Sequence, residues 1–387
     1  MSVDSSRERL RIGISIDSVH RTGGTQRSTW EIAERLGHIH DVTLITKQSD
    51  ALGTESFRCH VLDSKWVRLP YLGNLIFAWK VSRLKAKFNL DILNVQGSNG
   101  IYQDVITAQS VHKKWFRWSL GQTPVFSWPW WRKIFNPIHY IVIFLETIQY
   151  RSRMHRRVIA ISHQVKGDLI DHYGVDAKSI DVVHHGVNIC EFSPDLLDDS
   201  RSSIRAGLGI DANAIVVIFV AHEFKRKGLK ILLESLGQTP EKYCLLVIGK
   251  DDPSEFKTLA TALGIAHRVK FVGPQKLLGP WYRAADVFAF PTSYEAFGMV
   301  ITEALAAGIP VVVPREAGAA ELIEHGKGGY LMDRWDDVNQ LTGFLRKLED
   351  DALRAAMGKM ARLTAESRTW DDAANETLAV YYRVLKR

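Results

Sequence analysis

The chain has 387 residues, of which 46% are hydrophobic and 24% are charged, and it carries a formal net charge of +7. This length allows two domains with substantial cores, and the composition is that of a globular protein, which excludes a largely disordered chain. The mild positive excess fits an acidic substrate or an anionic membrane surface, whereas nucleic acid is not expected as a partner because no recognised binding module is present.

The start of the chain and the cysteines bear on localisation. Residues 1–10 are polar and charged and lack the apolar stretch of a secretory signal, so we expect a cytoplasmic protein. The three cysteines, Cys59, Cys190 and Cys244, are far apart and match no metal-ligand spacing. This favours structural thiols in a reducing compartment.

Short apolar strands alternate with helical patterns along the chain. The strands are expected at residues 11–17, 41–46, 90–95, 104–109, 215–221, 243–248, 269–272, 286–290 and 311–313. Such alternation predicts βαβ units, and therefore an α/β protein of two Rossmann-like domains with parallel sheets. We expect the first domain at 1–188, the second at 189–368, and a final helix within 369–387.

The most informative segment is residues 291–310, because it contains Glu295 and Glu303. An apolar run precedes it and an Ala- and Leu-rich run ends it, which indicates strand, loop and helix, with Glu295 on the loop and Glu303 about two turns into the helix. Unpaired N–H groups at such a helix start favour a phosphate. Those N–H groups would belong to Phe297, Gly298 and Met299. The alternative is an ordinary βα unit with solvated glutamates.

The sequence Glu295-Ala-Phe-Gly-x4-Glu303-Ala-Leu-Ala-x-Gly-x-Pro-Val resembles the donor-binding motif of the retaining family 4 glycosyltransferases. The resemblance extends over nearly the whole chain. It implies the GT-B architecture, in which two Rossmann-like domains face a central cleft and a C-terminal helix crosses back to the first domain. In that family the first carboxylate holds the donor sugar and the second binds the nucleotide ribose, which assigns these roles to Glu295 and Glu303.

The implied activity is transfer of a hexose-type sugar, with retention, from a nucleotide diphosphate donor to a glycan or glycolipid such as lipopolysaccharide. The leaving diphosphate needs positive charge, and the chain contains no Asp-x-Asp motif for a metal. Fixed cations act instead with little reorganisation. Residues 220–229 resemble the family's Arg-Lys-Gly motif, which places Arg226 and Lys227 on the donor phosphates; taken alone, Lys225 to Lys227 would form a solvated basic turn. We therefore expect no metal and no cofactor.

Further assignments follow from the same resemblance. Gly23 and Gly24 would let the backbone approach the diphosphate, and their pattern is not the Gly-x-Gly-x-x-Gly of a dinucleotide-binding dehydrogenase. Val272 lies where the family's backbone reads the base. Many relatives carry a His after the strand that here ends near Gln109, so either Gln109 or His112 is the candidate that faces the reacting sugar, with a surface position for His112 left open.

Residues 159–174 and 182–188 resemble the interdomain region of the same family. Its usual sequence has an Asn before the Gly, at the position of His185 in this chain. A metal site at His184 and His185 is less favoured than a structural turn, because adjacent residues of an extended chain point in opposite directions.

A basic and aromatic stretch lies between His112 and Arg157. It contains nine Lys or Arg, a single acid, Glu146, and five of the eleven tryptophans. Cations beside aromatic side chains indicate attachment to an anionic bilayer, and burial of the tryptophans in a core is the alternative. The apolar part, 138–148, is too short to span a membrane. Its position matches the region with which lipopolysaccharide-core relatives meet the membrane, so we expect peripheral attachment to the inner face of the cytoplasmic membrane.

Two other functions fit parts of the pattern. A non-hydrolysing sugar-nucleotide epimerase could share the two-domain shape, although the Glu295 and Glu303 motif argues against it. A non-catalytic membrane-associated subunit would keep the basic aromatic stretch but would not need both glutamates.

Overall fold

The structure is a computed structural model that describes residues 9–20, 23–62, 72–151, 155–194 and 198–386. It divides into two compact units, the first comprising Met1–His185 with Trp370–Arg387 and the second comprising Gly186–Thr369. The chain thus passes from one unit to the other after His185 and after Thr369. Two parts of the sequence discussed above lie outside the described residues: residues 1–8 of the polar N-terminal segment, and Arg153 of the basic stretch.

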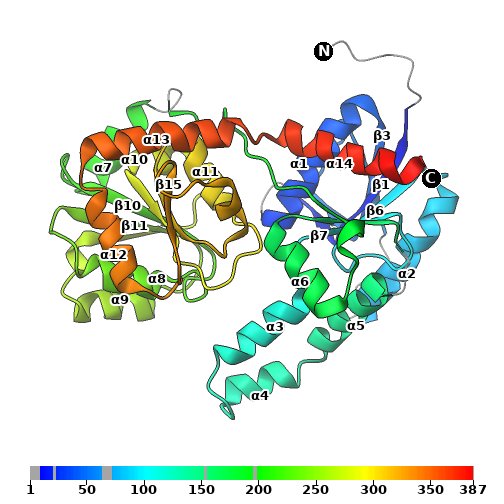
Figure 1. The fold of residues 1–387 in the computed structure, drawn as a ribbon, viewed down its shortest axis with the longest axis horizontal. Coiled ribbons are helices and arrows are strands. Elements are labelled where there is room, and N and C mark those ends of the chain that lie inside the picture. Colours follow the sequence, from blue (N-terminus) through cyan, green and yellow to red (C-terminus); the bar gives the residue numbers. More distant parts are fainter. Residues whose placement is uncertain (1–8, 21–22, 63–71, 152–154, 195–197, 387) are drawn as a thin grey trace. The chain divides into compact units, whose positions relative to one another are not determined.

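The first unit is built on a seven-stranded parallel sheet in the order β5-β3-β1-β6-β7-β8-β9 (Figure 1). From β1 the strands continue through β3 in one direction and through β6 in the other, which is the order of a Rossmann fold. The strands are β1 Arg11–Ser15, β3 Asp41–Thr46, β5 Arg58–Val61, β6 Ile92–Gln96, β7 Val105–Ala108, β8 Arg157–Ala160 and β9 Ile180–Val182, beside a separate pair of β2 Ser18–Val19 and β4 Gln48–Ser49.

The second unit repeats this plan with six parallel strands in the order β12-β11-β10-β13-β14-β15. The strands β10, β11, β13, β14 and β15 are buried on both faces, which explains why they are largely apolar runs in the sequence, whereas the edge strand β12 is only partly buried. The strands are β10 Ile215–Val220, β11 Tyr243–Ile248, β12 Val269–Gly273, β13 Val287–Ala289, β14 Val311–Pro314 and β15 Gly329–Met332. The helices are α7 Asp198–Gly207, α8 Leu229–Leu236, α9 Ser254–Ala262, α10 Gly279–Ala284, α11 Met299–Ala306, α12 Val338–Lys347 and α13 Asp351–Glu366.

The C-terminal helix α14, Trp370–Leu385, belongs to the first unit, as expected. Its buried side chains recur every three or four residues and include Trp370, Ala373 and Tyr381, so one apolar face packs inward. Asp371 pairs with Arg35 of α1 at 2.6 Å. The other helices of this unit are α1 Gly24–Ile39, α2 Leu72–Lys87, α3 His112–Gly121, α4 Trp128–Ile134, α5 Pro137–Arg151 and α6 His163–Tyr173.

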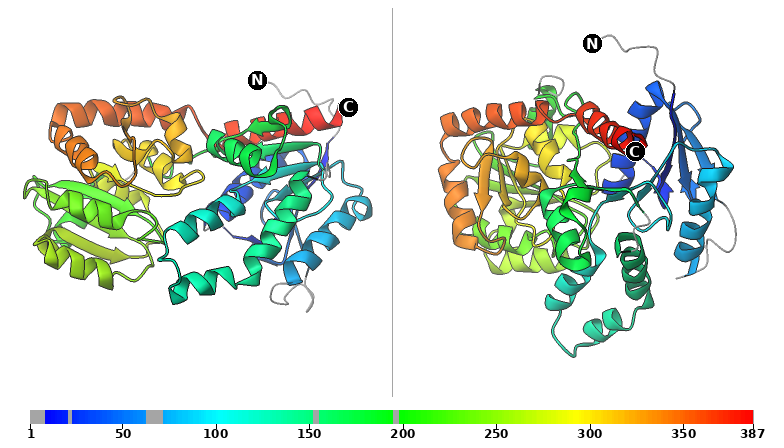
Figure 2. Two further views of the ribbon diagram at one scale, coloured as in Figure 1. Left: turned by 60° about the horizontal axis from the view of Figure 1, so that its bottom comes forward. Right: turned by 45° about the vertical axis from the view of Figure 1, so that its right-hand side comes forward.

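The basic aromatic stretch folds into α3, α4 and α5, which we call the arm (residues 112–151). The contacts of α3 and α5 with each other and with α6 hold the base of the arm, whereas α4 joins their far ends and lies away from the sheet (Figures 1 and 2). No side chain of α4 is buried. Within the described part of the chain, no helix combines the length and apolar character needed to cross a bilayer.

Candidate functional site

The candidate donor site lies where the strand order of the second sheet reverses, between β10 and β13. The loops after these two strands, 221–228 and 290–298, leave the same edge of the sheet, where α/β proteins bind ligands. Gly228 has a φ of 82°, and a Cβ at this position would overlap the carbonyl oxygen of Pro291. The N–H of Ser293 donates to the carbonyl oxygen of Arg226 at 3.0 Å. The two loops are therefore in direct backbone contact.

This contact brings Lys227 and Glu295 together. The Lys227 ammonium donates to the Glu295 carboxylate, and it lies 5.3 Å from the centre of the Phe290 ring. Lys227 is only 8% exposed. Burial lowers the pKa of its ammonium, and the Glu295 carboxylate opposes that shift. Because an unpaired charge would be costly at this depth, each side chain depends on the other when no ligand is bound.

Arg226 is engaged differently from its neighbour. One of its Nη atoms donates to the carbonyl oxygen of Tyr294 at 2.6 Å, while Nε and the other Nη donate to the Glu223 carboxylate at 2.8 and 2.9 Å. The guanidinium therefore ties the two loops together. Arg226 and Lys227 are therefore not fully solvated, whereas Lys225 is exposed, and a phosphate contact by Arg226 stays a prediction.

Glu303 lies in the second turn of α11 and is 4% exposed. Its carboxylate accepts a hydrogen bond from the Tyr282 hydroxyl at 3.1 Å. The helix begins after Gly298, whose φ of 95° is open mainly to glycine and whose added Cβ would lie 3.0 Å from Cγ of Glu295. The first N–H groups of α11 thus start beside Glu295, in the arrangement that favours an anion. Phe297 before them is buried, and Met299 is the first helical residue.

Val272 lies on the edge strand β12, and its carbonyl oxygen accepts from the side-chain amide of Gln275 at 3.4 Å. The predicted contact between the backbone of Val272 and the nucleotide base stays a prediction. In the first unit, Gly23 caps α1 with a φ of 83°, and Gly24 is the first helical residue. They follow β1, at which the strand order of the first sheet reverses. Residues 21 and 22, which precede them in the chain, lie outside the described residues.

The two candidates for contact with the reacting sugar have different surroundings. Gln109 directly follows β7, and its amide nitrogen donates to Oε1 of Gln96 at 2.9 Å. His112 begins α3, and its Nε2 lies 3.1 Å from Nδ1 of His139 in α5. Burial lowers the pKa of His112 to about 4, and His139 adds to the effect. His112 is therefore neutral at physiological pH and is held at the base of the arm.

Glu146 completes the base of the arm. It accepts a hydrogen bond from the His112 N–H at 3.0 Å and another from the Tyr173 hydroxyl. Burial raises its pKa to about 7, although these hydrogen bonds oppose the shift. The single acid of the basic stretch is thus a structural group at the start of α3.

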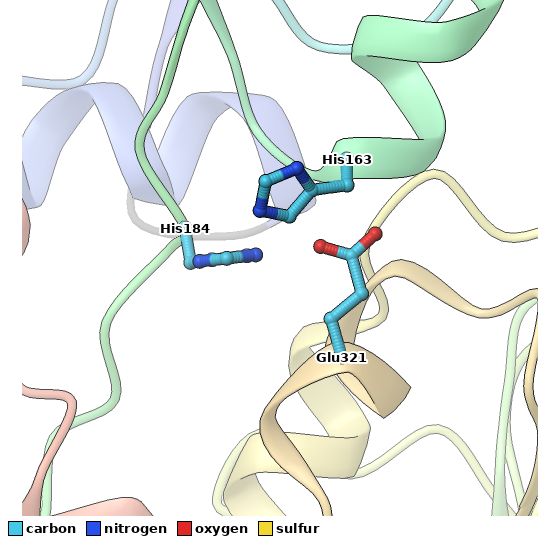
Figure 3. A group of neighbouring side chains, drawn as sticks. All are labelled: His163, His184 and Glu321. Carbon is cyan, nitrogen blue, oxygen red and sulfur yellow. The ribbon is translucent and has the colours of Figure 1, made fainter.

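His184 and His185 have different neighbours, as expected for adjacent residues of an extended chain. His184 lies with its ring centre 5.9 Å from that of His163, the first residue of α6 (Figure 3). Nε2 of His185 lies 3.1 Å from Oε1 of Gln109. Glu321, the third side chain in Figure 3, belongs to the second unit, in the 3-10 helix Gly318–Leu322.

Among the partners of the candidate residues that sequence reasoning missed are Tyr282 beside Glu303, Tyr294 beside Arg226, and Gln96 beside Gln109. Only for Gln96 was a signal present, because it is a polar residue at the end of a buried apolar strand. The other two partners come from distant segments, so no local pattern reveals them.

Two protein-family models match the chain, one in each half. The model described as Glycosyltransferase Family 4 matches residues 22–190, and the model described as Glycosyl transferases group 1 matches residues 200–364. The chain belongs to the family 4 glycosyltransferases. The resemblance seen in the sequence is thereby confirmed.

Among curated relatives of this family 4 member are two D-inositol 3-phosphate glycosyltransferases. The one from Corynebacterium kroppenstedtii is 32% identical over 244 residues, covering 60% of this chain and 54% of the relative. The one from Streptomyces avermitilis is 34% identical over 240 residues, covering 58% and 51%. The chain therefore spans about half the length of the curated relatives it matches.

Solved structures confirm the fold. WaaG, a glycosyltransferase involved in lipopolysaccharide biosynthesis, superposes with a TM-score of 0.78 at 21% identity, over 96% of this chain and 99% of WaaG. HepE from Anabaena, in complex with UDP and glucose, gives a TM-score of 0.72 at 20% identity, over 97% and 100% of the two chains. The expected class of two Rossmann-like halves is thus correct.

Proposed function

We propose that this protein is a retaining, metal-independent glycosyltransferase that moves a hexose-type sugar from a nucleotide diphosphate donor to a glycan or glycolipid acceptor. The observation that carries the proposal is the pair formed by the buried Lys227 and the partly buried Glu295 at the strand-order reversal, beside the start of α11. One site thereby offers positive charge for a diphosphate and carboxylates for hydroxyl groups. The UDP and glucose named for HepE support a donor of this class.

Each residue of the second unit has a separate role in this proposal. Glu295 accepts hydrogen bonds from the donor sugar, and Glu303 accepts them from the ribose. Lys227, with the N–H groups at the start of α11, neutralises the diphosphate. In the first unit, Gln109 is the stronger candidate for contact with a sugar, because it directly follows β7 at the carboxyl edge of the sheet, whereas His112 contacts His139 at the base of the arm.

A membrane-bound acceptor is favoured by the arm. None of its five tryptophans is buried, and Trp128 is 79% exposed. These tryptophans therefore do not form a buried core. Phe126, at 73% exposure, has a φ of 63°, a strained conformation that is concentrated at functional sites. The exposed large apolar side chains of the arm are Val125, Phe126, Trp128, Trp131, Phe135, Tyr140 and Phe144. Such a patch marks an interaction surface, and we propose peripheral binding to an anionic membrane on its cytoplasmic face.

The donor proposal is tested by incubating the protein with UDP-, GDP- and ADP-sugars and following sugar release or transfer, with and without EDTA. We expect turnover of at least one donor, retention of the anomeric configuration by NMR, and survival in EDTA, because Lys227 and the α11 start supply the positive charge. Complete loss on chelation, with recovery in manganese, would show that the site needs a metal. No turnover of any donor with glycolipid or phosphorylated cyclitol acceptors would contradict the function itself.

The membrane proposal is tested with a variant carrying Arg117→Gln and Arg132→Gln, two exposed cations of the arm. Each Lys or Arg near an anionic surface contributes about 1 kcal/mol, so affinity for anionic vesicles should fall roughly thirtyfold. Vesicle sedimentation measures it. High salt should weaken native binding, since the Debye length falls from about 8 Å at physiological ionic strength to about 3 Å at 1 M.

The matched control removes two exposed lysines outside the arm, Lys359→Gln and Lys386→Gln. It makes the same change in net charge and should bind vesicles almost as the native protein does. A second variant, Phe126→Ser with Trp128→Ser, should weaken binding without changing charge. Equal binding by the arm variants and the control would mean that the arm serves a soluble acceptor or another partner.

A further inference from the structure

The amide of Gln109 is held on both sides. Its nitrogen donates to Oε1 of Gln96 at 2.9 Å and lies 3.5 Å from the Ser28 hydroxyl. Its oxygen lies 3.1 Å from Nε2 of His185. Because an amide oxygen can only accept, the His185 ring must donate in this contact. One lone pair of the Gln109 oxygen is left for a further donor, such as a sugar hydroxyl.

His185 is itself fixed by its place in the chain. It is the last residue of the first unit before the chain crosses, and it is 8% exposed. Its ring centre lies 5.8 Å from that of Trp370, the residue at which the chain returns to this unit. Trp370 is 2% exposed, so its packing restrains the imidazole from one side.

A small polar cavity adjoins the pair. Its volume is about 30 Å³, enough for one water molecule, and Gln96, Gln109 and His185 are among the residues that line it. On another wall the Thr107 hydroxyl donates to Asn94, whose amide nitrogen donates to Tyr381 of α14. Two sets of hydrogen bonds, one through Gln96, Gln109 and His185 and one through Thr107, Asn94 and Tyr381, therefore lie at the end of β7 and restrain its side chains.

We propose that His185 is a positioning residue for transfer: it holds the Gln109 amide with its oxygen directed at a sugar hydroxyl. This inference rests on the proposed glycosyltransferase activity. It assigns His185 a role that acts through Gln109 and not through contact with the nucleotide.

The contact of 3.1 Å makes Gln109 and His185 one unit for substitution. Exchanging one residue alone would put two imidazoles or two amides in contact, whereas exchanging both keeps one donor ring and one amide.

The experiment is the reciprocal exchange, made as Gln109→His, His185→Asn, and both together. Turnover of the donor identified for the native protein, the Michaelis constant for that donor, and the melting temperature are measured for each. We expect each single variant to lower kcat roughly tenfold or more with little change in the donor KM, since Gln109→His removes the amide proposed to meet the sugar and His185→Asn replaces the donor ring with a shorter side chain. The double variant should recover to within about threefold of the native kcat, because the two sites are coupled.

Two further variants separate positioning from packing. His185→Phe keeps the ring beside Trp370 but cannot donate, and it should lower kcat at least as much as His185→Asn, whose amide is shorter than the imidazole. His185→Gln keeps an N–H donor and should retain more activity than His185→Phe. Native kcat in His185→Phe, or no recovery in the double variant, would overturn the inference while leaving the glycosyltransferase function standing.

If the native protein turns over no donor, the proposed function is wrong. The coupling of Gln109 and His185 is then judged from the melting temperatures of the variants. A coupled pair predicts that the double variant loses less stability than the sum of the single variants. Strictly additive losses would overturn the pairing as well.

Discussion

Glu295→Gln is expected to lower turnover roughly tenfold or more, while nucleotide diphosphate affinity stays near native. The carboxylate is proposed to accept hydrogen bonds from the donor sugar, and a charge-assisted hydrogen bond contributes about 1.5–3 kcal/mol. Glu303→Gln should instead weaken nucleotide binding more than turnover, because its carboxylate is assigned to the ribose. Calorimetric titration with the nucleotide diphosphate and steady-state turnover measure the two effects separately.

The matched control is Glu255→Gln, which makes the same change at an exposed residue of α9 in the same unit. It should leave both quantities at native values. Loss of the charge of Glu295 also leaves Lys227 without its partner, so the melting temperature of each variant must be recorded. Native kinetics in both folded variants would remove the central assignment of the site.

Gly228→Ala is expected to destabilise the second unit and to abolish nucleotide binding. The new Cβ would meet the carbonyl oxygen of Pro291, and the backbone is in the left-handed region with a φ of 82°. Backbone strain costs about 1–2 kcal/mol and overpacking a further 1–3 kcal/mol. Because the loops must separate, Lys227 and Glu295 would no longer meet. Thermal unfolding and nucleotide titration check both effects.

Gly264→Ala provides the control for backbone strain alone. Gly264 also has a positive φ, 72°, but no atom lies within 4 Å of an added Cβ. It should cost only the strain, about 1–2 kcal/mol or roughly 2–8 °C in melting temperature for a unit of this size, and nucleotide affinity should be unchanged. If the two variants behaved alike, the contact between the loops would not be what organises the site.

The sequence predicted nine of the thirteen strands that the structure describes in the two sheets, but not β5, β8, β9 and β15. The strands expected at 41–46, 243–248 and 311–313 match β3, β11 and β14 closely, since a strand buried on both faces must be a continuous apolar run. The final helix was expected at 370–385 and is found there as α14. These features depend on residues that are close together in the sequence, so a local sequence pattern predicts them.

The side-chain partners of the site could not be predicted in this way. Lys227 and Glu295 were each expected to contact the donor, but nothing in either segment indicated that they contact each other. The same holds for Gln109, whose partner His185 is 76 residues away. The arm was expected to be basic and aromatic, yet its folding into three helices with an exposed α4 was not foreseen, because its apolar residues follow no single helical face.

The sequence by itself determined the family, most strands of the two parallel sheets and the loop that carries Glu295, because motif spacing and strand hydrophobicity are properties of consecutive residues. The tertiary structure alone decided which charges are paired and that the His112 ring contacts His139. Those outcomes depend on burial and on contacts between segments far apart in the chain. Burial raises the cost of an unpaired charge, so packing selects the partner of Lys227, a choice that no local pattern contains.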